Sequence, residues 1–293
     1  MNDQDWLAER FEQHRTRLRA VSYRMLGSLS EADDAVQEAW LRLSRADTSQ
    51  VDDLGAWLTT VVARICLNAL RSRAARREEL IDPHVPDPIV SAVDAVDPGD
   101  EALIADSVGL ALLIVLDTLA PAERLAFVLH DVFDVPFVQV AAIIDRSEPA
   151  ARQLASRARR RLRTTATPDT GIAEQWELVD AFLAAARDGD FDALLTVLDP
   201  DVVRRVDAGA TGPDVPRILR GAQDVASGAI AFNTLRYVAQ RALVNGAPGV
   251  VTFAGEEPFA VLGFTVARGK IVEMNVLTDP ARLRRLDLTV LAR

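Results

Sequence analysis

Residues 147–163 contain six arginines and one acidic residue, Glu148. A guanidinium group is permanently charged and offers five N–H donors, so such a cluster is suited to binding phosphate. Small and apolar residues recur at helical spacing along the same stretch: Ala151, Leu154, Ala158 and Leu162. The stretch therefore predicts a helix with one packing face and one arginine-rich face.

A solvated surface helix would also explain these arginines if they stood alone. They are preceded by residues 136–145 (PFVQVAAIID), which have the apolar spacing of a short helix, and by Asp145-Arg146-Ser147, which is typical of a tight turn. Ser147 is a suitable N-cap, and Pro149 suits a first helical turn. Two helices joined in this way predict a helix-turn-helix, whose second helix enters the major groove of DNA.

A second basic segment lies at residues 57–77, which hold five arginines and no acid. Trp57 offers a stacking surface for unpaired bases, although a place in the core is an alternative for it, and Asn68 can hydrogen-bond a base edge. Arg64 adds to the positive charge of the segment, and four further arginines are suited to holding the backbone of a separated strand: Arg71, Arg73, Arg76 and Arg77.

Charge is segregated along the chain, so the net charge of −10 does not exclude a nucleic-acid partner. Residues 81–123, between the two basic segments, carry nine acids and no lysine or arginine. Two basic segments separated by an acidic, proline-containing stretch suggest two contacts with one polyanion.

Composition narrows the remaining classes of protein. The 293 residues are enough for two or three domains with packed cores. One cysteine, Cys66, cannot form an internal disulfide, and neither a basic-then-apolar leader nor an apolar run of 18 residues is present. We therefore expect a cytoplasmic protein that does not contact the membrane. One cysteine and three scattered histidines provide no zinc-ligand spacing, so we expect no metal and no other cofactor.

Three units follow from the periodicity. Residues 1–80 read as one all-α domain with helices at about 3–27, 31–45 and 53–79, and residues 100–166 form a second all-α domain that contains the helix-turn-helix. Residues 81–99, with four prolines, read as a linker that runs partly extended. Residues 167–293 read as an α+β domain with a curved sheet packed on its helices. Within it we expect helices at 172–188 and 190–197 and strands at 202–208, 236–244, 249–255, 259–269 and 270–277.

With these features the chain resembles a bacterial sigma factor of the extracytoplasmic-function group of the sigma-70 family, over nearly its whole length. Residues 31–43 (EADDAVQEAWLRL) resemble the acidic helix that docks on the RNA polymerase core. The resemblance implies that the contact is made by Asp33, Asp34, Gln37, Glu38 and Leu41. Asp34, Glu38 and Leu41 recur at helical spacing, which would offer carboxylates beside an apolar edge, although an ordinary solvated acidic face is the alternative.

The resemblance also distributes promoter contacts over the two basic segments. Residues 54–77 are similar to the promoter-melting and minus-ten-reading helix, which implies contacts from Trp57, Asn68, Arg71, Arg73, Arg76 and Arg77. The helix-turn-helix resembles the minus-thirty-five reader, with Arg152 and Gln153 as base-edge readers and with further contacts from Ser156, Arg157, Arg159 and Arg160. The family usually has a glycine in this turn where the chain has Asp145, a residue type that tolerates left-handed geometry.

About 125 residues follow the point at which such sigma factors end. They resemble a SnoaL-like domain, a cone-shaped α+β fold with a pocket that is fused to one sigma subgroup. Residues 82–88 (DPHVPDP) are similar to that subgroup's linker motif, and residues 279–283 (DPARL) to its extension motif, while residues 206–209 resemble a third motif weakly. The resemblance implies regulatory contacts at Pro83, His84, Pro86, Asp87 and Pro88 in the linker and at Asp279, Pro280, Arg282 and Leu283 in the extension.

The predicted function is that of a non-enzymatic sigma factor that directs core RNA polymerase to promoter DNA. We expect the extension to contact the sigma domains or their linker and to modulate activity, with an unknown small molecule as a possible ligand of its pocket. One alternative is a helix-turn-helix regulator that senses a ligand without polymerase. Another is a sigma-like protein fused to an isomerase or hydrolase, but all three histidines lie outside residues 168–293. Catalysis there would depend on other groups: Asp207, Asp214, Glu256 and Glu257, with Arg204 or Arg205 near them.

Overall fold

The computed structural model describes residues 3–46, 51–77, 84–93, 109–163, 171–210, 215–233 and 237–291, without the side chains of 3–5, 76, 77 and 233. The chain divides into two compact units. The first contains Met1–Ile81 and Val115–Thr165, and the second contains Asp82–Ile114 and Ala166–Arg293.

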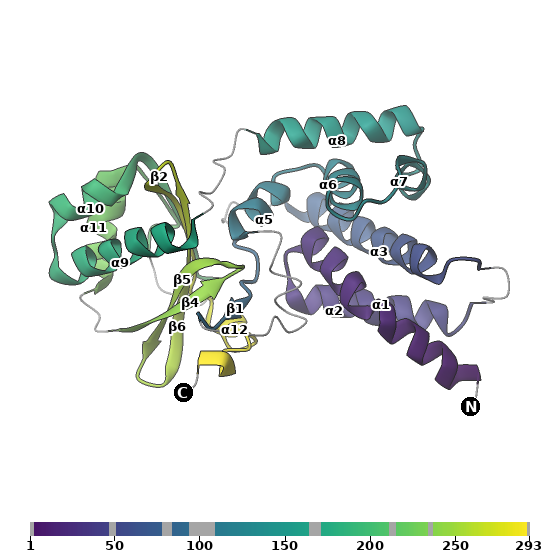
Figure 1. Ribbon diagram of the computed structural model, residues 1–293, viewed down its shortest axis with the longest axis horizontal. Helices are drawn as coiled ribbons and strands as arrows, with labels where there is room; N and C mark the ends of the chain where they lie inside the picture. The colour runs from purple at the N-terminus through teal and green to yellow at the C-terminus, as the bar shows by residue number, and fades with distance from the viewer. Residues whose placement is uncertain are drawn as a thin grey trace. The chain divides into compact units, whose positions relative to one another are not determined.

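The first unit is helical (Figure 1). Its N-terminal part consists of α1 (Asp3–Leu26), α2 (Leu29–Leu43) and α3 (Leu54–Arg77), which lie within about two residues of the predicted helices. Gly27, at a φ of 69°, ends α1 in a left-handed conformation that favours glycine, and Ser28 then caps α2 by accepting a hydrogen bond from the Glu31 amide. Fully buried side chains such as Tyr23, Leu43 and Leu58 form the core.

The second part of this unit holds the helix-turn-helix. It contains α6 (Pro121–Phe127), a π-helical turn η1 (Val128–Val132), α7 (Phe137–Ile144) and α8 (Glu148–Leu162); α5 (Leu110–Asp117) crosses the boundary between the units. The π-helical turn was not predicted. It is followed by Asp134 at a φ of 56°, and the His130 ring lies 3.6 Å from the Phe137 ring.

The second unit is an α+β fold with one seven-stranded sheet, in the order β1-β4-β5-β6-β7-β2-β3. The strands are β1 (Val90–Ser91), β2 (Leu198–Asp207), β3 (Ile218–Arg220), β4 (Val238–Val244), β5 (Ala247–Ala254), β6 (Glu257–Ala267) and β7 (Lys270–Leu277). All neighbours are antiparallel except β2 and β7, and irregularities in the pairing of β2, β5 and β6 accompany the curvature of the sheet.

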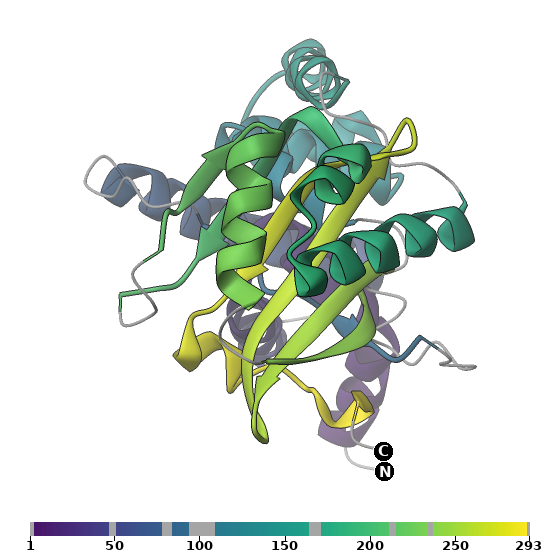
Figure 2. The ribbon, with the colours of Figure 1, turned by 90° about the vertical axis from the view of Figure 1, so that its left-hand side faces the viewer.

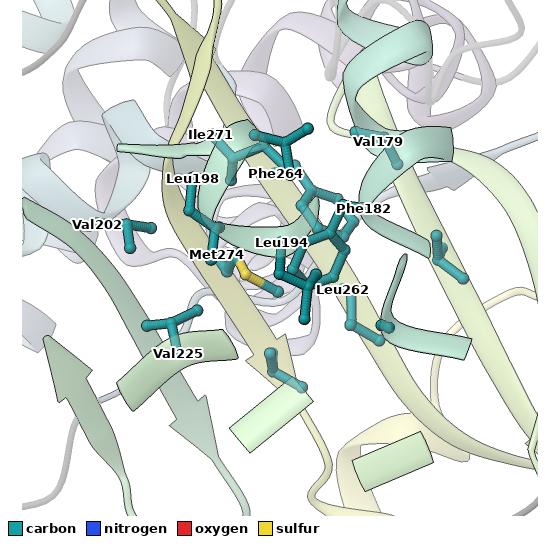
Figure 3. Close-up of a cluster of buried hydrophobic side chains, with 14 of the residues drawn as sticks. Val179, Phe182, Leu194, Leu198, Val202, Val225, Leu262, Phe264, Ile271 and Met274 are labelled. Carbon is teal, nitrogen blue, oxygen red and sulfur yellow. The ribbon is translucent and has the colours of Figure 1, made fainter. Parts of the chain in front are cut away.

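Three helices cover one face of this sheet: α9 (Ile172–Asp188), α10 (Phe191–Val197) and α11 (Ala222–Asn233), as Figure 2 shows. Their apolar side chains meet those of the sheet in one core, in which Phe182 of α9 lies edge-on to Phe264 of β6 with ring centroids 5.6 Å apart (Figure 3). A short helix, α12 (Pro280–Leu283), and a 3-10 turn, η2 (Thr289–Leu291), follow the last strand.

These features confirm the predicted fold class: helical sigma-like domains followed by an α+β domain with the SnoaL-like arrangement of helices on a curved sheet. Five elements of the second unit were not predicted: β1, β3, α11, α12 and η2. The most informative is β1, because it lies in the stretch that the sequence assigns to a linker. Residues Val85, Ile89 and Val90 of that stretch are buried in the second unit.

Candidate functional site

The arginine-rich helix α8 has the two faces that its sequence predicts. Ala151, Ala155 and Ala158 are buried, whereas Leu154 and Leu162 are half-buried. Asp145 adopts the left-handed conformation, with φ 57° and ψ 56°, which confirms that the turn survives without glycine. Ser147 occupies the N-cap position, as predicted, and its side chain makes no capping hydrogen bond.

Several predicted DNA contacts on α8 have partners within the unit. Arg152 pairs with Glu148 one turn earlier, and its guanidinium lies 4.6 Å from the centre of the Phe137 ring. Arg159 donates to Asp131 at 2.6 Å. The remaining predicted residues on this face are exposed: Gln153, Ser156, Arg157 and Arg160. Exposed ion pairs are worth at most about 1 kcal/mol, so a phosphate can replace the Glu148 carboxylate at little cost.

The predicted DNA-contacting residues of the long helix α3 differ in their surroundings: some are exposed, and one contacts neighbouring helices. Asn68 and Arg71 are exposed, and Trp57 is half-buried. Arg73 instead donates to the Leu26 carbonyl at 2.8 Å and pairs with Glu31, so it ties α3 to the start of α2. Arg76 and Arg77 belong to the helix, but their side chains lie outside the described residues.

The predicted polymerase-docking face of α2 is accessible. Asp33, Asp34, Gln37 and Leu41 are exposed, and Glu38 is half-buried. Asp33 accepts a hydrogen bond from Arg19 at 2.7 Å, and Glu38 accepts one from Arg42 at 2.8 Å. The opposite face of α2 is buried through Ala32, Val36, Ala39 and Leu43. The helix therefore presents carboxylates beside an apolar edge at Leu41.

Within the first unit, the helix-turn-helix part packs against the N-terminal helices. Arg124 of α6 is buried, and its guanidinium donates to the Arg24 carbonyl at 3.1 and 3.2 Å and to Asp117 at 3.0 Å. Arg17 of α1 donates to the Phe133 carbonyl at 2.8 Å, and Arg64 of α3 donates to the Ala142 carbonyl at 3.3 Å. Hydrogen bonds from arginines to backbone carbonyls thus hold the two helical parts together.

In the second unit, the predicted extension motif is built around Arg282. Asp279 caps α12 by accepting hydrogen bonds from the amides of Ala281 and Arg282, and Pro280 occupies the first turn. Leu283 is buried and fixes the helix to the unit. This short capped helix therefore sets the direction of the Arg282 side chain.

Arg282 binds the predicted linker motif and β2 at once. Its Nε donates to Asp87 Oδ1 at 2.8 Å, its Nη1 to Asp207 Oδ2 at 2.6 Å, and its Nη2 to the Val85 carbonyl at 2.6 Å. Two carboxylates and a carbonyl on one guanidinium form a strong, directional contact. We call this group of residues, Arg282 with Val85, Asp87 and Asp207, the Arg282 clamp.

Asp207 accepts from several donors in addition to Arg282. The backbone amides of Val85 and Gly209 donate to it at 3.0 and 3.2 Å, and His84 Nδ1 lies 3.3 Å from Oδ2. Burial alone would raise the pKa of Asp207, but the hydrogen bonds from His84 and the two amides, together with the Arg282 charge, outweigh burial and lower it from 3.8 to about 2. The carboxylate is therefore ionised throughout the neutral range.

A second anchor holds the linker segment farther along. Asn245 lies in the β4–β5 turn at a φ of 51°. Its side-chain Oδ1 accepts a hydrogen bond from the Ile89 backbone amide at 3.1 Å, and its backbone amide donates to the Ile89 carbonyl at 2.8 Å. Val90 and Ser91 then pair with Val244 and Leu243 of β4. Sequence reasoning missed Asn245, although Asn-Gly at 245–246 is a strong signal for a hairpin turn.

The other linker residues lie around these contacts. Pro86 and Pro88 are buried and His84 is half-buried, whereas Pro83 lies outside the described residues. Proline has no amide hydrogen, so these positions contribute packing while Val85 and Ile89 contribute the backbone donors.

The carboxylates considered for catalysis do not gather at one site. Asp207 is engaged in the Arg282 clamp, whereas Glu256 and Glu257 are exposed at the turn between β5 and β6. Asp214 lies outside the described residues. Among the residues that the structure describes, no group of three histidine, cysteine or acidic side chains could hold a metal ion, and no helix could span a membrane.

Known proteins share this organisation. Residues 10–76 match the Sigma-70 region 2 family, and residues 110–162 match the Sigma-70, region 4 family. The ECF RNA polymerase sigma factor SigJ of Mycobacterium tuberculosis is 39% identical over 289 residues, which cover 92% of this chain and 91% of SigJ. The probable ECF RNA polymerase sigma factor SigI of the same species is 35% identical over 290 residues, 97% of each chain.

A solved structure agrees over the full length. The crystal structure of M. tuberculosis SigJ, an extracytoplasmic function sigma factor, superimposes with a TM-score of 0.75 and 34% sequence identity, covering 96% of this chain and 99% of SigJ. The relatives therefore share the extension as well as the two helical regions. The chain belongs to the extracytoplasmic-function RNA polymerase sigma factors and carries a C-terminal SnoaL-like α+β domain.

Proposed function

We propose that α8 reads the minus-thirty-five element, that α3 reads and helps to open the minus-ten element, and that the C-terminal domain modulates both by holding the linker. Members of this family bind RNA polymerase core and promoter DNA. The Arg282 clamp is the observation that carries the modulation, because it joins the C-terminal domain to the segment between the two promoter-reading regions.

On α8, the exposed residues support a division of labour. Gln153 lies near the helix N-terminus, the part of a recognition helix that approaches base edges. Arg157 and Arg160 are suited to phosphate contacts, and Ser156 supplements them. Arg152 joins Gln153 as a base reader once DNA displaces Glu148, while Arg159 first has to leave Asp131.

On α3, the exposed Asn68 and Arg71 are the strongest candidates for minus-ten contacts, followed by Trp57 and the arginines at 76 and 77. Arg73 is better explained as a positioning residue, since its contacts with Leu26 and Glu31 fix α3 against its neighbours. For core polymerase we propose the exposed face of α2, along which Asp34, Glu38 and Leu41 follow one another at helical spacing.

The compact first unit cannot engage both promoter elements as it stands. Two elements about 25 base pairs apart are separated by about 85 Å along B-form DNA, at 3.4 Å per base pair. A compact unit of this length has a radius of gyration of about 14 Å, which corresponds to a diameter below 40 Å. The hydrogen bonds of Arg124 and Arg17 between the helical parts must therefore break when polymerase separates them.

This separation gives the linker its importance. A linker that is free can extend by about 3.3 Å per residue. Residues 84–91 are instead held in the C-terminal sheet by the Arg282 clamp and by Asn245. They therefore cannot extend to increase the distance between the two promoter-reading regions. The C-terminal domain therefore restrains the opened form, and release of the linker raises activity.

Transcription by reconstituted polymerase tests this proposal. Core polymerase would be combined with the full-length wild-type chain, with Arg282→Ala, or with Arg285→Ala, a matched variant at an exposed position of the same segment. Two quantities would be measured for each chain. The first is transcription from a genomic fragment that a genome-wide binding profile identifies, and the second is affinity for core polymerase. We expect Arg282→Ala to raise one or both by about 5-fold or more, a typical coupling, while Arg285→Ala stays at the wild-type value. Equal transcription and equal core affinity for all three chains would contradict the proposed modulation but would leave the promoter-reading assignments unchanged.

A further inference from the structure

The second unit contains a cavity of about 1260 Å³, larger than many drug-sized ligand sites. It opens between the helices and the concave face of the sheet, and all of its lining residues belong to this unit. Most of the lining is apolar, with Phe182 of α9, Leu262 of β6 and Met274 of β7 among the side chains labelled in Figure 3.

Aromatic rings form one wall of the cavity. Tyr237 is stacked on Phe259 with ring centroids 4.1 Å apart, and Phe232 lies 5.1 Å from Tyr237. Stacked and offset aromatic rings present both faces and edges, which favours a ligand that itself contains rings. An apolar wall of this kind gives affinity without defining an orientation.

Arg204 of β2 is one of the few charged residues in this lining. Its Nη2 donates to the Pro216 carbonyl at 3.2 Å, while its Nε is buried and has no hydrogen-bond partner within the described residues. Burial lowers the pKa of Arg204, because desolvation disfavours the charged form. No carboxylate of the described residues pairs with it, although Asp224 also lines the cavity.

Other arginines of the unit contrast with Arg204. Arg205, the next residue on β2, points to the opposite side of the strand and pairs with Glu273 at 2.6 Å. Arg241, which also lines the cavity, stacks on Trp176 and lies 3.7 Å from Asp180. A half-buried guanidinium without a carboxylate loses part of its hydration, and a bound anion would compensate for this loss.

The fold makes room for the Arg204 side chain. Gly228 of α11 lies beside it, and a Cβ at this position would sit 3.1 Å from Arg204 Nη1 and 2.9 Å from Leu219 Cδ1. Glycine is unfavourable in a helix interior, so its presence here is consistent with space kept for the guanidinium.

We propose that this cavity binds a small amphipathic acid, a ring-containing apolar molecule with one anionic group that pairs with Arg204. The aromatic wall takes the rings, and the Arg204 guanidinium, which lines the cavity, takes the anion in a charge-assisted hydrogen bond. The chain as a whole carries a charge of −10, so an anion is not attracted to its surface in general. This proposal does not depend on the promoter assignments, because binding is measured on the chain alone.

Two fluorescent probes with the same ring system test it. 8-Anilinonaphthalene-1-sulfonate carries one sulfonate, and N-phenyl-1-naphthylamine lacks it. Both would be titrated into the full-length wild-type protein, Arg204→Gln, and Arg220→Gln, a matched arginine exposed on β3. We expect Arg204→Gln to weaken the sulfonate probe by about tenfold or more, with the neutral probe within about twofold, and Arg220→Gln to change neither. A sulfonate affinity that is unchanged in Arg204→Gln would overturn the proposal.

A second measurement needs no variant at Arg204. 1-Naphthoate and its uncharged counterpart 1-naphthamide would compete for N-phenyl-1-naphthylamine bound to the wild-type protein, and we expect the acid to displace it about tenfold better. Equal displacement would reject an anionic ligand. Ala239→Trp, at an exposed cavity-lining position of β4, is expected to weaken both probes, and full binding of both probes to this variant would place their site outside the cavity.

Discussion

Arg282 and Asp87 are 195 positions apart in the sequence, yet Nε of the arginine lies 2.8 Å from Oδ1 of the aspartate. Both side chains are largely buried, with 17% and 12% of their surfaces exposed. A partly buried pair of this kind cannot lose one partner without leaving an uncompensated charge. The contact is therefore a point at which single substitutions act on the linker and the C-terminal domain together.

Asp207 predicts a pH dependence of stability. Its folded pKa of about 2 lies below the ordinary 3.8, so its contribution is complete above about pH 4 and is lost as the pH falls toward 2. The shift corresponds to about 2 kcal/mol. Urea unfolding of wild type and Asp207→Asn should differ by about this amount at pH 5 and by much less near pH 2. A difference that does not depend on pH would show that the carboxylate charge is not what stabilises the clamp.

Asn245 predicts a local effect on the linker. Asn245→Gly keeps a residue type suited to the positive φ but removes the side-chain oxygen that accepts the Ile89 amide. A lost hydrogen bond of about 1 kcal/mol should speed hydrogen exchange of the Ile89 amide about 5-fold. The control is Asn245→Asp, which retains an acceptor and should keep exchange close to the wild-type rate.

Gln153 and Arg157 on α8 should fail in different ways. Gln153→Ala should cost about 1–3 kcal/mol of holoenzyme binding to the cognate promoter and relax the preference at one base pair. Arg157→Ala should weaken binding to all sequences alike and reduce the salt dependence by about one counterion. Binding of holoenzyme to promoter variants at several salt concentrations separates the two. Identical behaviour of the two variants would argue against a base reader at position 153.

Arg71 and Arg73 form a matched pair on α3. Arg73→Ala removes the hydrogen bond to the Leu26 carbonyl and the pairing with Glu31, so it should lower the free energy of unfolding by about 1–2 kcal/mol. Arg71→Ala, at an exposed position, should leave unfolding unchanged and weaken formation of the open promoter complex. Denaturant unfolding and permanganate footprinting measure these two effects. If Arg73→Ala does not change the free energy of unfolding, Arg73 is not a positioning residue and is again a candidate DNA contact.

Local sequence patterns predicted most of the helices and strands. The helices of region 2, the two helices around Asp145 and the strands from β4 to β7 have apolar patterns that the sequence shows locally, and turn residues separate them. Helix α11 was not predicted; it contains Gly228, a residue type that is unfavourable in a helix interior and that lies beside Arg204 here.

Pairings between distant segments could not be read in this way. The stretch around Pro86 and Pro88 has the composition of a free linker, and its pairing with β4 depends on Asn245, more than 150 residues away. The resemblance to a sigma subgroup directed attention to Arg282 and Asp87, but it did not indicate Asp207 as their third partner. Buried partners of this kind are determined by tertiary structure, which a single sequence does not encode in any local pattern.

The burial of Val85, Ile89 and Val90 in the C-terminal sheet means that the chain enters this domain twice, once before and once after region 4. The domain is thus interleaved with the sigma regions and is not a tail appended to them. Truncation of the chain after residue 166 would expose these three apolar side chains and the backbone donors between them. The shortened protein would therefore lose a domain and would also gain an exposed segment that is prone to aggregation.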